Sequence, residues 1–257
     1  MLETMLKTIA KSLDLAAASA NSIEQLSATT PISLAQAYEI QRLSINERIA
    51  RGETLVGYKM GFTSRAKMEQ MGVDDLIWGR LTNTMIIEQD QVIDLDNYVH
   101  PRAEPEIAFK LKAPLAGKVT AEQALAAVEA IAPAIEIIDS RYQNFKFSLS
   151  DVIADNCSST GFIVGKWQQA DTELSDLLMK LLINEEVSAQ GMSNEILDHP
   201  LNSLIEAARC VAEYGETLEA GQIILAGAAT AAVALEKNQT IRVSVDTLGG
   251  CQFSTQA

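Results

Sequence analysis

Histidine and cysteine are scarce in this sequence. Its 257 residues contain two histidines, His100 and His199, and three cysteines, and none of them stands in the spacing of zinc ligands. Three cysteines are too few for a disulfide framework, so we expect reduced thiols in a cytoplasmic protein. The sequence also lacks the glycine-rich nucleotide-binding motifs and the serine-nucleophile motif GxSxG, which argues against those classes of enzyme.

Positive charge and long apolar runs are scarce as well. Acidic residues outnumber basic ones by 34 to 20, and the formal net charge of −14 argues against a nucleic-acid partner. No apolar run reaches the length of a membrane span, and residues 1–20 have the spaced apolar pattern of an amphipathic helix rather than of a signal peptide. A small anionic substrate fits this charge if a metal or a few basic side chains concentrate positive charge locally.

The residues that are present predict an α+β protein with a helical N-terminal part. Apolar spacing predicts a helix over 2–19, and a capping box at Ser33–Gln36 begins a second helix. Farther along the chain, strands dominate. We therefore divide the chain into residues 1–75, a helical part that also holds a lysine-bearing strand, and residues 76–257, a strand-rich catalytic domain.

Apolar patterns and turn residues predict the remaining elements. Helices are expected at 121–132, behind a capping box that starts at Thr120, at 201–214, and from Ser64 to Met71. The strands are expected at 55–62, 84–94, 103–111, 134–139, 160–164, 178–189, 222–226 and 240–254.

The segment Arg102–Phe109, RAEPEIAF, carries two carboxylates in a mostly apolar strand. Because side chains alternate along a strand, Glu104 and Glu106 share one face. Pro105 has no amide hydrogen, so we expect an edge strand or a bulge here. The two carboxylates then either lie on a solvent-exposed edge strand, where their charge prevents pairing with another strand, or they surround a cation.

A third acid favours the cation. Glu136 lies in an apolar segment, Pro133–Asp139, whose composition predicts a strand covered on both faces. A buried carboxylate must be neutralised, paired or metal-bound, and three converging glutamates would repel one another without a cation. Three carboxylates would leave about three positions of an octahedral Mg²⁺ or Mn²⁺ open. The alternative is that Glu136 simply pairs with an arginine such as Arg141.

Lys59 is the basic candidate. On the strand GYKMG it shares one face with Gly57 and Gly61, and two neighbours without side chains leave room for a ligand beside it. The alternative is an exposed lysine on an edge strand. Weaker candidates are the polar segment 155–161, DNCSSTG, and the small-residue segment Gly227–Thr230, since such loops are usually only loops.

Together these segments resemble a known family. GYKMGFTS, RAEPEIAF, PAIEIIDSR, ADNCSST, DHPLN and AGQIILAGAAT occur in this order, over roughly residues 30–254. The combination is similar to the 2-hydroxypentadienoate hydratase and 4-oxalocrotonate decarboxylase branch of the fumarylacetoacetase superfamily. The resemblance implies a mixed β-barrel or roll with helices outside it. It also implies a Mg²⁺ or Mn²⁺ site at Glu104, Glu106 and Glu136, and an active-site lysine at Lys59.

Substrate contacts are also implied by the resemblance. Arg141 would either pair with a ligand glutamate or reach the substrate. The expected substrate-binding residues are Met60, Gly61, Leu81, Ser158, Ser159 and Thr230.

Three stretches are more similar to the decarboxylases of this branch than to the hydratases: KMGFTSRAKMEQMGV, IWGRL and IDSRYQNFKFSLSDVIADN. The favoured function is therefore metal-dependent decarboxylation of 2-oxohex-3-enedioate (4-oxalocrotonate) to 2-hydroxypenta-2,4-dienoate, in meta-cleavage catabolism of aromatic compounds. The alternatives are hydration of that dienoate to 4-hydroxy-2-oxopentanoate, and a non-catalytic metal-binding oligomer. A carbon–carbon hydrolase would need an acid–histidine pair, and neither histidine lies near the N-terminal helices. The resemblance further implies a homo-oligomer and a complex with the companion hydratase.

Overall fold

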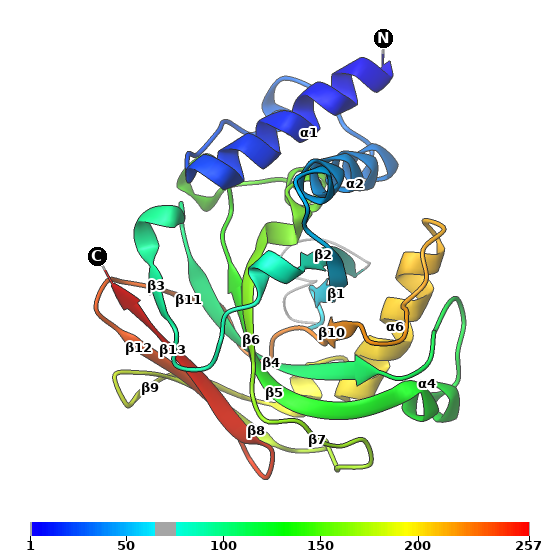
Figure 1. The fold of residues 1–257 in the computed structure, drawn as a ribbon, viewed down its shortest axis with the longest axis vertical. Helices are drawn as coiled ribbons and strands as arrows, with labels where there is room; N and C mark the ends of the chain where they lie inside the picture. Colours follow the sequence, from blue (N-terminus) through cyan, green and yellow to red (C-terminus); the bar gives the residue numbers. More distant parts are fainter. Residues whose placement is uncertain (1, 65–75, 257) are drawn as a thin grey trace.

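Two mixed β-sheets form the centre of the computed structural model, which describes residues 2–64 and 76–256 (Figure 1). The larger sheet has the strand order β2-β1-β10-β4-β5-β6, with β11 beside β4 and β7 beside β5, and the smaller one has the order β3-β13-β12-β8-β9. The strands are β1 (Leu55–Gly61), β2 (Ile77–Thr82), β3 (Val92–Asp94), β4 (Arg102–Leu111), β5 (Val128–Ile138), β6 (Ser159–Val164), β7 (Gln168–Gln169), β8 (Leu178–Ile183), β9 (Glu186–Met192), β10 (Ile223–Leu225), β11 (Val233–Ala234), β12 (Thr240–Val245) and β13 (Gly249–Gln256).

The helices lie around the larger sheet (Figure 1). The helices are α1 (Leu2–Ser19), α2 (Leu34–Ala50), α4 (Ala121–Ala127), α5 (Leu149–Ala154) and α6 (Pro200–Ala212). Helices α1 and α2 pack together at one end of the molecule, while α4 and α6 lie beside β4 and β5 (Figure 1). The carboxylate of Asp14 on α1 receives two hydrogen bonds from Arg51 at the end of α2, of 2.6 and 2.7 Å. A helical N-terminal segment on a β-roll is the fold that the sequence predicts.

The long strands β4 and β5 have two different faces. One face, which includes Ile107 and Ile135, packs against the smaller sheet, where Val243 and Phe253 are fully buried. The other face carries the three glutamates. Because both faces are covered, charged groups on the second face lie inside the protein.

Several predicted boundaries are wrong, and local backbone geometry explains why. The helix expected at 121–132 ends at Ala127, because Val128 already pairs with Leu111 in the larger sheet. The strand expected at 84–94 is reduced to β3, because Asp90 takes a left-handed φ of 64° that interrupts an extended chain. Strand β2 and helix α5 are not among the predicted elements. The helix expected from Ser64 to Met71 lies outside the described residues.

Strand β4 is not an edge strand, and it pairs with β5 without a register shift at Pro105, so the interpretation of Pro105 as an edge or a bulge is wrong. It pairs with β5 on one side and with β10 and β11 on the other. The carbonyl oxygens of Pro105 and Ile107 accept hydrogen bonds from the segment that joins β10 to β11, at Ala229 and Ala226. The N–H and C=O groups of a residue in a strand point toward the same neighbouring strand. The backbone nitrogen of Pro105, which carries no hydrogen, therefore points toward the gap between β10 and β11. A proline therefore costs no ladder bond with β5.

The predicted division at residue 75 runs through one sheet. Strand β1, from the N-terminal part, pairs with β2 and β10 from the C-terminal part. No helix in the described part of the chain is long and apolar enough to cross a membrane.

Candidate metal centre

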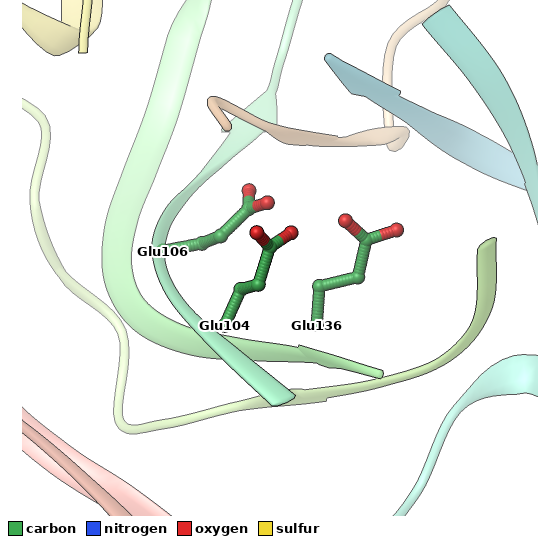
Figure 2. Close-up of side chains that lie close together, drawn as sticks. All are labelled: Glu104, Glu106 and Glu136. Carbon is green, nitrogen blue, oxygen red and sulfur yellow. The ribbon is translucent and has the colours of Figure 1, made fainter. Parts of the chain in front are cut away.

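Three glutamates converge on the covered face of β4 and β5. Glu104 and Glu136 are direct partners in the register of the two strands, and Glu106 follows two positions later on the same face. Figure 2 shows the three side chains pointing into one space. One carboxylate oxygen from each lies within 4.8 Å of the other two. Glu106 and Glu136 are fully buried and Glu104 is 8% exposed. The alternative that Glu104 and Glu106 lie on a solvent-exposed edge strand is therefore wrong.

The electrostatics of the cluster fit a divalent cation. Burial, and then the neighbouring charge of Glu136, raise the pKa of Glu106 well above its ordinary value. Within the described residues, Oε1 of Glu106 and Oε1 of Glu136 are buried without a hydrogen-bond partner. The cluster brings three acidic groups together, and the Lys59 ammonium pairs with Glu136. Acidic oxygen ligands of this kind are what Mg²⁺ and Mn²⁺ require.

Lys59 lies inside the site rather than on an exposed edge. Its strand β1 lies between β2 and β10, and its side chain is 4% exposed. The ammonium nitrogen lies 2.8 Å from Oε2 of Glu136. Burial by itself lowers the pKa of Lys59, but the carboxylates, Glu136 first, raise it above its ordinary value. The alternative pairing of Glu136 with Arg141 is therefore wrong, and Lys59 is charged at neutral pH.

The segment after β10 holds Glu106 in place. The backbone N–H of Gly227 donates to Oε2 of Glu106 over 2.8 Å. Gly227 has a φ of +95°, and a Cβ there would lie 2.1 Å from Oγ1 of Thr63. Only glycine permits this conformation and this approach. The sequence indicates that small residues matter here, but not that a backbone amide orients a carboxylate.

The segment Asp155–Ser159 connects α5 to β6 in an unusual conformation. Asn156, Cys157 and Ser158 take consecutive left-handed φ values of 50°, 50° and 60°. Single non-glycine residues of this kind are uncommon, and three in a row must be held by their surroundings. The Cys157 thiol donates to the Trp78 carbonyl over 3.1 Å, and burial raises its pKa to about 12, so it is no thiolate nucleophile at neutral pH.

Asn156 fastens this segment to β2. Its Oδ1 accepts from the backbone N–H of Arg80 over 2.8 Å, and its Nδ2 donates to the Arg80 carbonyl over 2.9 Å. The neighbouring Gly79 is the strand partner of Lys59, and a Cβ there would lie 2.6 Å from the Asn156 carbonyl oxygen. The segment thus packs directly against the strand pair that carries Lys59. No sequence pattern indicates this role for Asn156.

The two serines of this segment, Ser158 and Ser159, are both buried. Ser159 lies beside Glu136, whose pKa its hydroxyl group lowers, although burial raises that pKa more strongly. The hydroxyl of Ser158 is buried without a hydrogen-bond partner among the described residues. Both positions agree with a polar group that faces a ligand.

The guanidinium of Arg141 forms hydrogen bonds with Asp155 and Thr160 rather than with the glutamates. Its Nε donates to Oδ1 of Asp155 over 2.5 Å, its Nη2 to the Asp155 carbonyl and its Nη1 to Thr160, each over 2.6 Å. None of these hydrogen bonds goes to Glu104, Glu106 or Glu136. What Arg141 does is anchor the Asp155–Ser159 segment to the end of β5.

The remaining predicted contacts divide between the two faces of β1 and β2. Gly61 and Leu81 share the face of Lys59, and Leu81 belongs to a buried apolar cluster with Ala108 and Phe162, which lie on the glutamate face. Met60 points to the opposite face, opposite Trp78 in the core, so only its backbone can face the site.

Thr230 lies in the segment between β10 and β11. Its hydroxyl donates to the Ala231 carbonyl over 3.0 Å.

The sequence profile of the fumarylacetoacetate (FAA) hydrolase C-terminal family matches residues 57–255, so the chain belongs to this family. A 4-oxalocrotonate decarboxylase from Pseudomonas sp. is 56% identical over 247 residues, 96% of each chain. A 2-hydroxyhexa-2,4-dienoate hydratase from Comamonas testosteroni is 31% identical over 86% of each chain. The solved structure of 4-oxalocrotonate decarboxylase from Pseudomonas putida G7, complexed with magnesium and adipate, matches with a TM-score of 0.95 and 35% identity over 98% of each chain. The resemblance found in the sequence and the expected fold are confirmed.

Proposed function

We propose that this chain catalyses the metal-dependent decarboxylation of 2-oxohex-3-enedioate to 2-hydroxypenta-2,4-dienoate, as a carbon–carbon lyase of aromatic catabolism. The observation that carries the proposal is the convergence of three buried glutamates and one buried lysine on a single face. The 56% identity to a 4-oxalocrotonate decarboxylase supports the decarboxylase branch over the hydratases, which are less similar. The magnesium and adipate in the matched decarboxylase structure support a divalent cation and a six-carbon diacid.

Glu104, Glu106 and Glu136 would hold Mg²⁺, or Mn²⁺ in its place. When bound, this cation supplies Lewis acidity and neutralises the charge of a 2-oxo acid. The Gly227 N–H occupies Oε2 of Glu106, so Oε1, which has no partner among the described residues, would be available to the cation. The glutamates take no other part in the chemistry. In terms of the predicted division, residues 76–257 supply these ligands and residues 1–75 supply the lysine.

In the reaction, the bond between C5 and C6 breaks and C6 leaves as CO₂. The electron pair of that bond moves through C4 and C3 onto the C2 oxygen, and a proton on that oxygen completes the 2-hydroxydienoate. The Lys59 ammonium stabilises the negative charge that develops on the substrate and can deliver this proton from Nζ. Because Glu136 keeps Lys59 protonated, the lysine acts as an acid or a fixed charge at neutral pH.

The walls of the site bind and shield the substrate. Ser158, Ser159 and Thr230 are the polar groups assigned to substrate oxygens, with Gly61 and the Met60 backbone beside Lys59. Leu81 and its apolar neighbours exclude water from the site, which strengthens every charge interaction inside it. Arg141 keeps a supporting role through Asp155.

A two-substrate assay tests the function. The purified chain with Mg²⁺ is offered 2-oxohex-3-enedioate and 2-hydroxypenta-2,4-dienoate separately, and CO₂ release and the ultraviolet spectra of the dienes are followed. CO₂ release from the first compound is the expected result. Turnover of the second compound alone would replace the proposal by the hydratase, and turnover of neither would favour a non-catalytic metal-binding protein.

We also propose a homo-oligomeric cytoplasmic enzyme that associates with a companion hydratase. The family resemblance supports this assembly, and the reaction gives it a chemical reason, because a 2-hydroxydienoate is an unstable enol that a neighbouring hydratase would consume. Light scattering of the purified chain, alone and with the hydratase, measures both assemblies.

A further inference from the structure

Arg102, the first residue of β4, lies on the face that carries the metal ligands. Strands β4 and β5 pair without a register shift from Arg102 to Lys110, so Arg102, Glu104 and Glu106 point the same way. Arg102 is the partner of Ile138, two positions beyond the pair of Glu104 and Glu136. At a rise of about 3.4 Å per residue, its Cα lies about 7 Å from that of Glu104.

An aromatic side chain orients Arg102. The Cζ atom of its guanidinium lies 4.3 Å from the ring centroid of Phe145, and His100 packs edge-on against the same ring at 6.3 Å. Phe145 belongs to the segment that leaves the end of β5, next to Arg102 in the sheet. Stacking fixes the plane of the guanidinium without using any of its N–H groups.

The N–H groups of Arg102 are left for a ligand. In the described part of the chain, no hydrogen bond or ion pair reaches its guanidinium, and the residue is partly exposed. Other arginines near the larger sheet differ, since Arg141 is held by Asp155 and Thr160, and Arg80 by Gln41 and Glu216. Arg102 thus lies on the face that carries the metal ligands, its guanidinium plane is fixed by Phe145, and its N–H groups have no partner among the described residues.

A six-carbon diacid has a second charge that the glutamate cluster cannot bind. Its 2-oxo acid end belongs at the metal, so its distal carboxylate needs a separate cation, a few ångströms along the same face. We propose that Arg102 binds the distal carboxylate of the dicarboxylic substrate, an inference that rests on the proposed function. The planar guanidinium suits two parallel N–H···O bonds to a carboxylate. It also selects diacids over the monoacids of related reactions.

The role of Arg102 has a kinetic signature. The carboxylate that it binds leaves as neutral CO₂, so this contact exists with the substrate and weakens as the bond breaks. Loss of Arg102 should therefore raise KM for 2-oxohex-3-enedioate about tenfold or more, while kcat stays the same or rises. A residue needed only for the fold would lower kcat as well.

Calorimetry with two non-reactive acids tests the proposal apart from catalysis. Adipate and hexanoate have the same chain length but differ in the second carboxylate. With Mg²⁺ present, the unmodified chain should bind adipate more tightly, and Arg102→Met should lose about tenfold in adipate affinity without a change for hexanoate. Arg102→Lys should recover part of the preference. The matched control is Arg242→Met, which removes an arginine that is 47% exposed on the smaller sheet.

Three results would overturn the proposal. These are an unmodified chain that does not prefer adipate, an Arg102→Met variant that keeps the preference, and equal losses for both acids, which would indicate general damage to the site. The proposed function fails by a different measurement, the absence of CO₂ release. A chain with no decarboxylase turnover whose adipate preference still depends on Arg102 would contradict the function alone.

Discussion

The Lys59 ammonium lies 2.8 Å from the carboxylate of Glu136, and both side chains are buried. The lysine comes from β1 and the glutamate from β5, on opposite sides of the strand pair β10 and β4 in the larger sheet. One buried ion pair inside a cluster of three carboxylates cannot balance the charge alone. The pair therefore has two roles: it keeps Lys59 protonated, and it leaves the remaining negative charge for a divalent cation.

Replacing Lys59 by methionine tests the first role. We expect kcat to fall by about 10²–10⁴-fold, because the developing negative charge loses its positive partner and its proton donor. Mg²⁺ binding should persist, since all three glutamates remain. Steady-state kinetics and magnesium calorimetry measure the two effects. Lys110→Met is the control, because Lys110 is a lysine of β4 that is 35% exposed and paired with Glu129. Equal activity of the two variants would contradict the role of Lys59.

Glu106→Gln tests the metal site. The substitution keeps the shape of the side chain but removes one ligand charge, so magnesium affinity and kcat/KM should fall by about 100-fold or more. The melting temperature without metal should stay the same or rise, because burial and Glu136 already disfavour the charged form of Glu106. Glu129→Gln, at a half-exposed position of β5, should change neither quantity. Full activity of Glu106→Gln without added metal would refute the site.

The sequence predicts the faces of single strands but not the neighbours of those strands. Alternation puts Glu104 and Glu106 together, and the apolar surroundings of Glu136 indicate burial, so the residue pattern alone predicts the acidic cluster. The expected edge strand at Pro105 is wrong because the partner on that side changes from β10 to β11, and only the topology reveals that gap.

Side-chain partners from distant segments are equally hard to predict. Arg141 is expected near the glutamates because it follows Glu136 closely in sequence. Instead it turns to Asp155, which the chain brings back through α5. Arg102 stands in the same motif as the metal ligands, but its importance depends on the stacking of Phe145, which no spacing rule predicts.

The metal-free protein should lose stability as the pH rises. The pKa of Glu106 in the folded state is raised above its ordinary value of 4.5. At a pH between 4.5 and this raised pKa, the folded chain keeps a proton on Glu106 that the unfolded chain has released. Folding stability therefore falls with increasing pH from about 4.5 upward. Lys59 does not change the pH dependence of folding stability in this range. Its pKa is raised above 10.5 in the folded state, so its contribution to stability is fully present at all lower pH values.

Urea unfolding in EDTA and in Mg²⁺, between pH 5 and 8, measures this dependence. Bound Mg²⁺ requires ionised glutamates, so it should remove the downward slope and stabilise the chain more at higher pH. Glu106→Gln in EDTA should show a flatter profile than the unmodified chain. Asp155, whose pKa burial raises to about 6, adds a slope of the same sign up to that pH in both proteins. Identical slopes with and without Mg²⁺ would rule out the coupling.

Asn156→Ala tests whether the left-handed segment positions the site. The variant loses both hydrogen bonds to the Arg80 backbone and a residue type that tolerates a left-handed φ, so we expect a loss of about 1–3 kcal/mol in stability. We also expect kcat and magnesium affinity to fall, because Lys59, Ser158 and Ser159 depend on this packing. Asn156→Gly separates the two causes, since glycine accepts the φ but lacks the amide.

The matched control for Asn156 is Ser193→Ala. Ser193 is fully buried outside the larger sheet, and its hydroxyl makes the same kind of clamp, to Leu174 and Leu177 of the backbone. The Ser193→Ala substitution should lower the free energy of unfolding by a similar amount, while kcat and magnesium affinity stay unchanged. If Asn156→Ala matched this control in kinetics and metal binding, the segment would serve the fold alone. A partial recovery in Asn156→Asp, which keeps the acceptor for the Arg80 N–H, would instead support the positioning role.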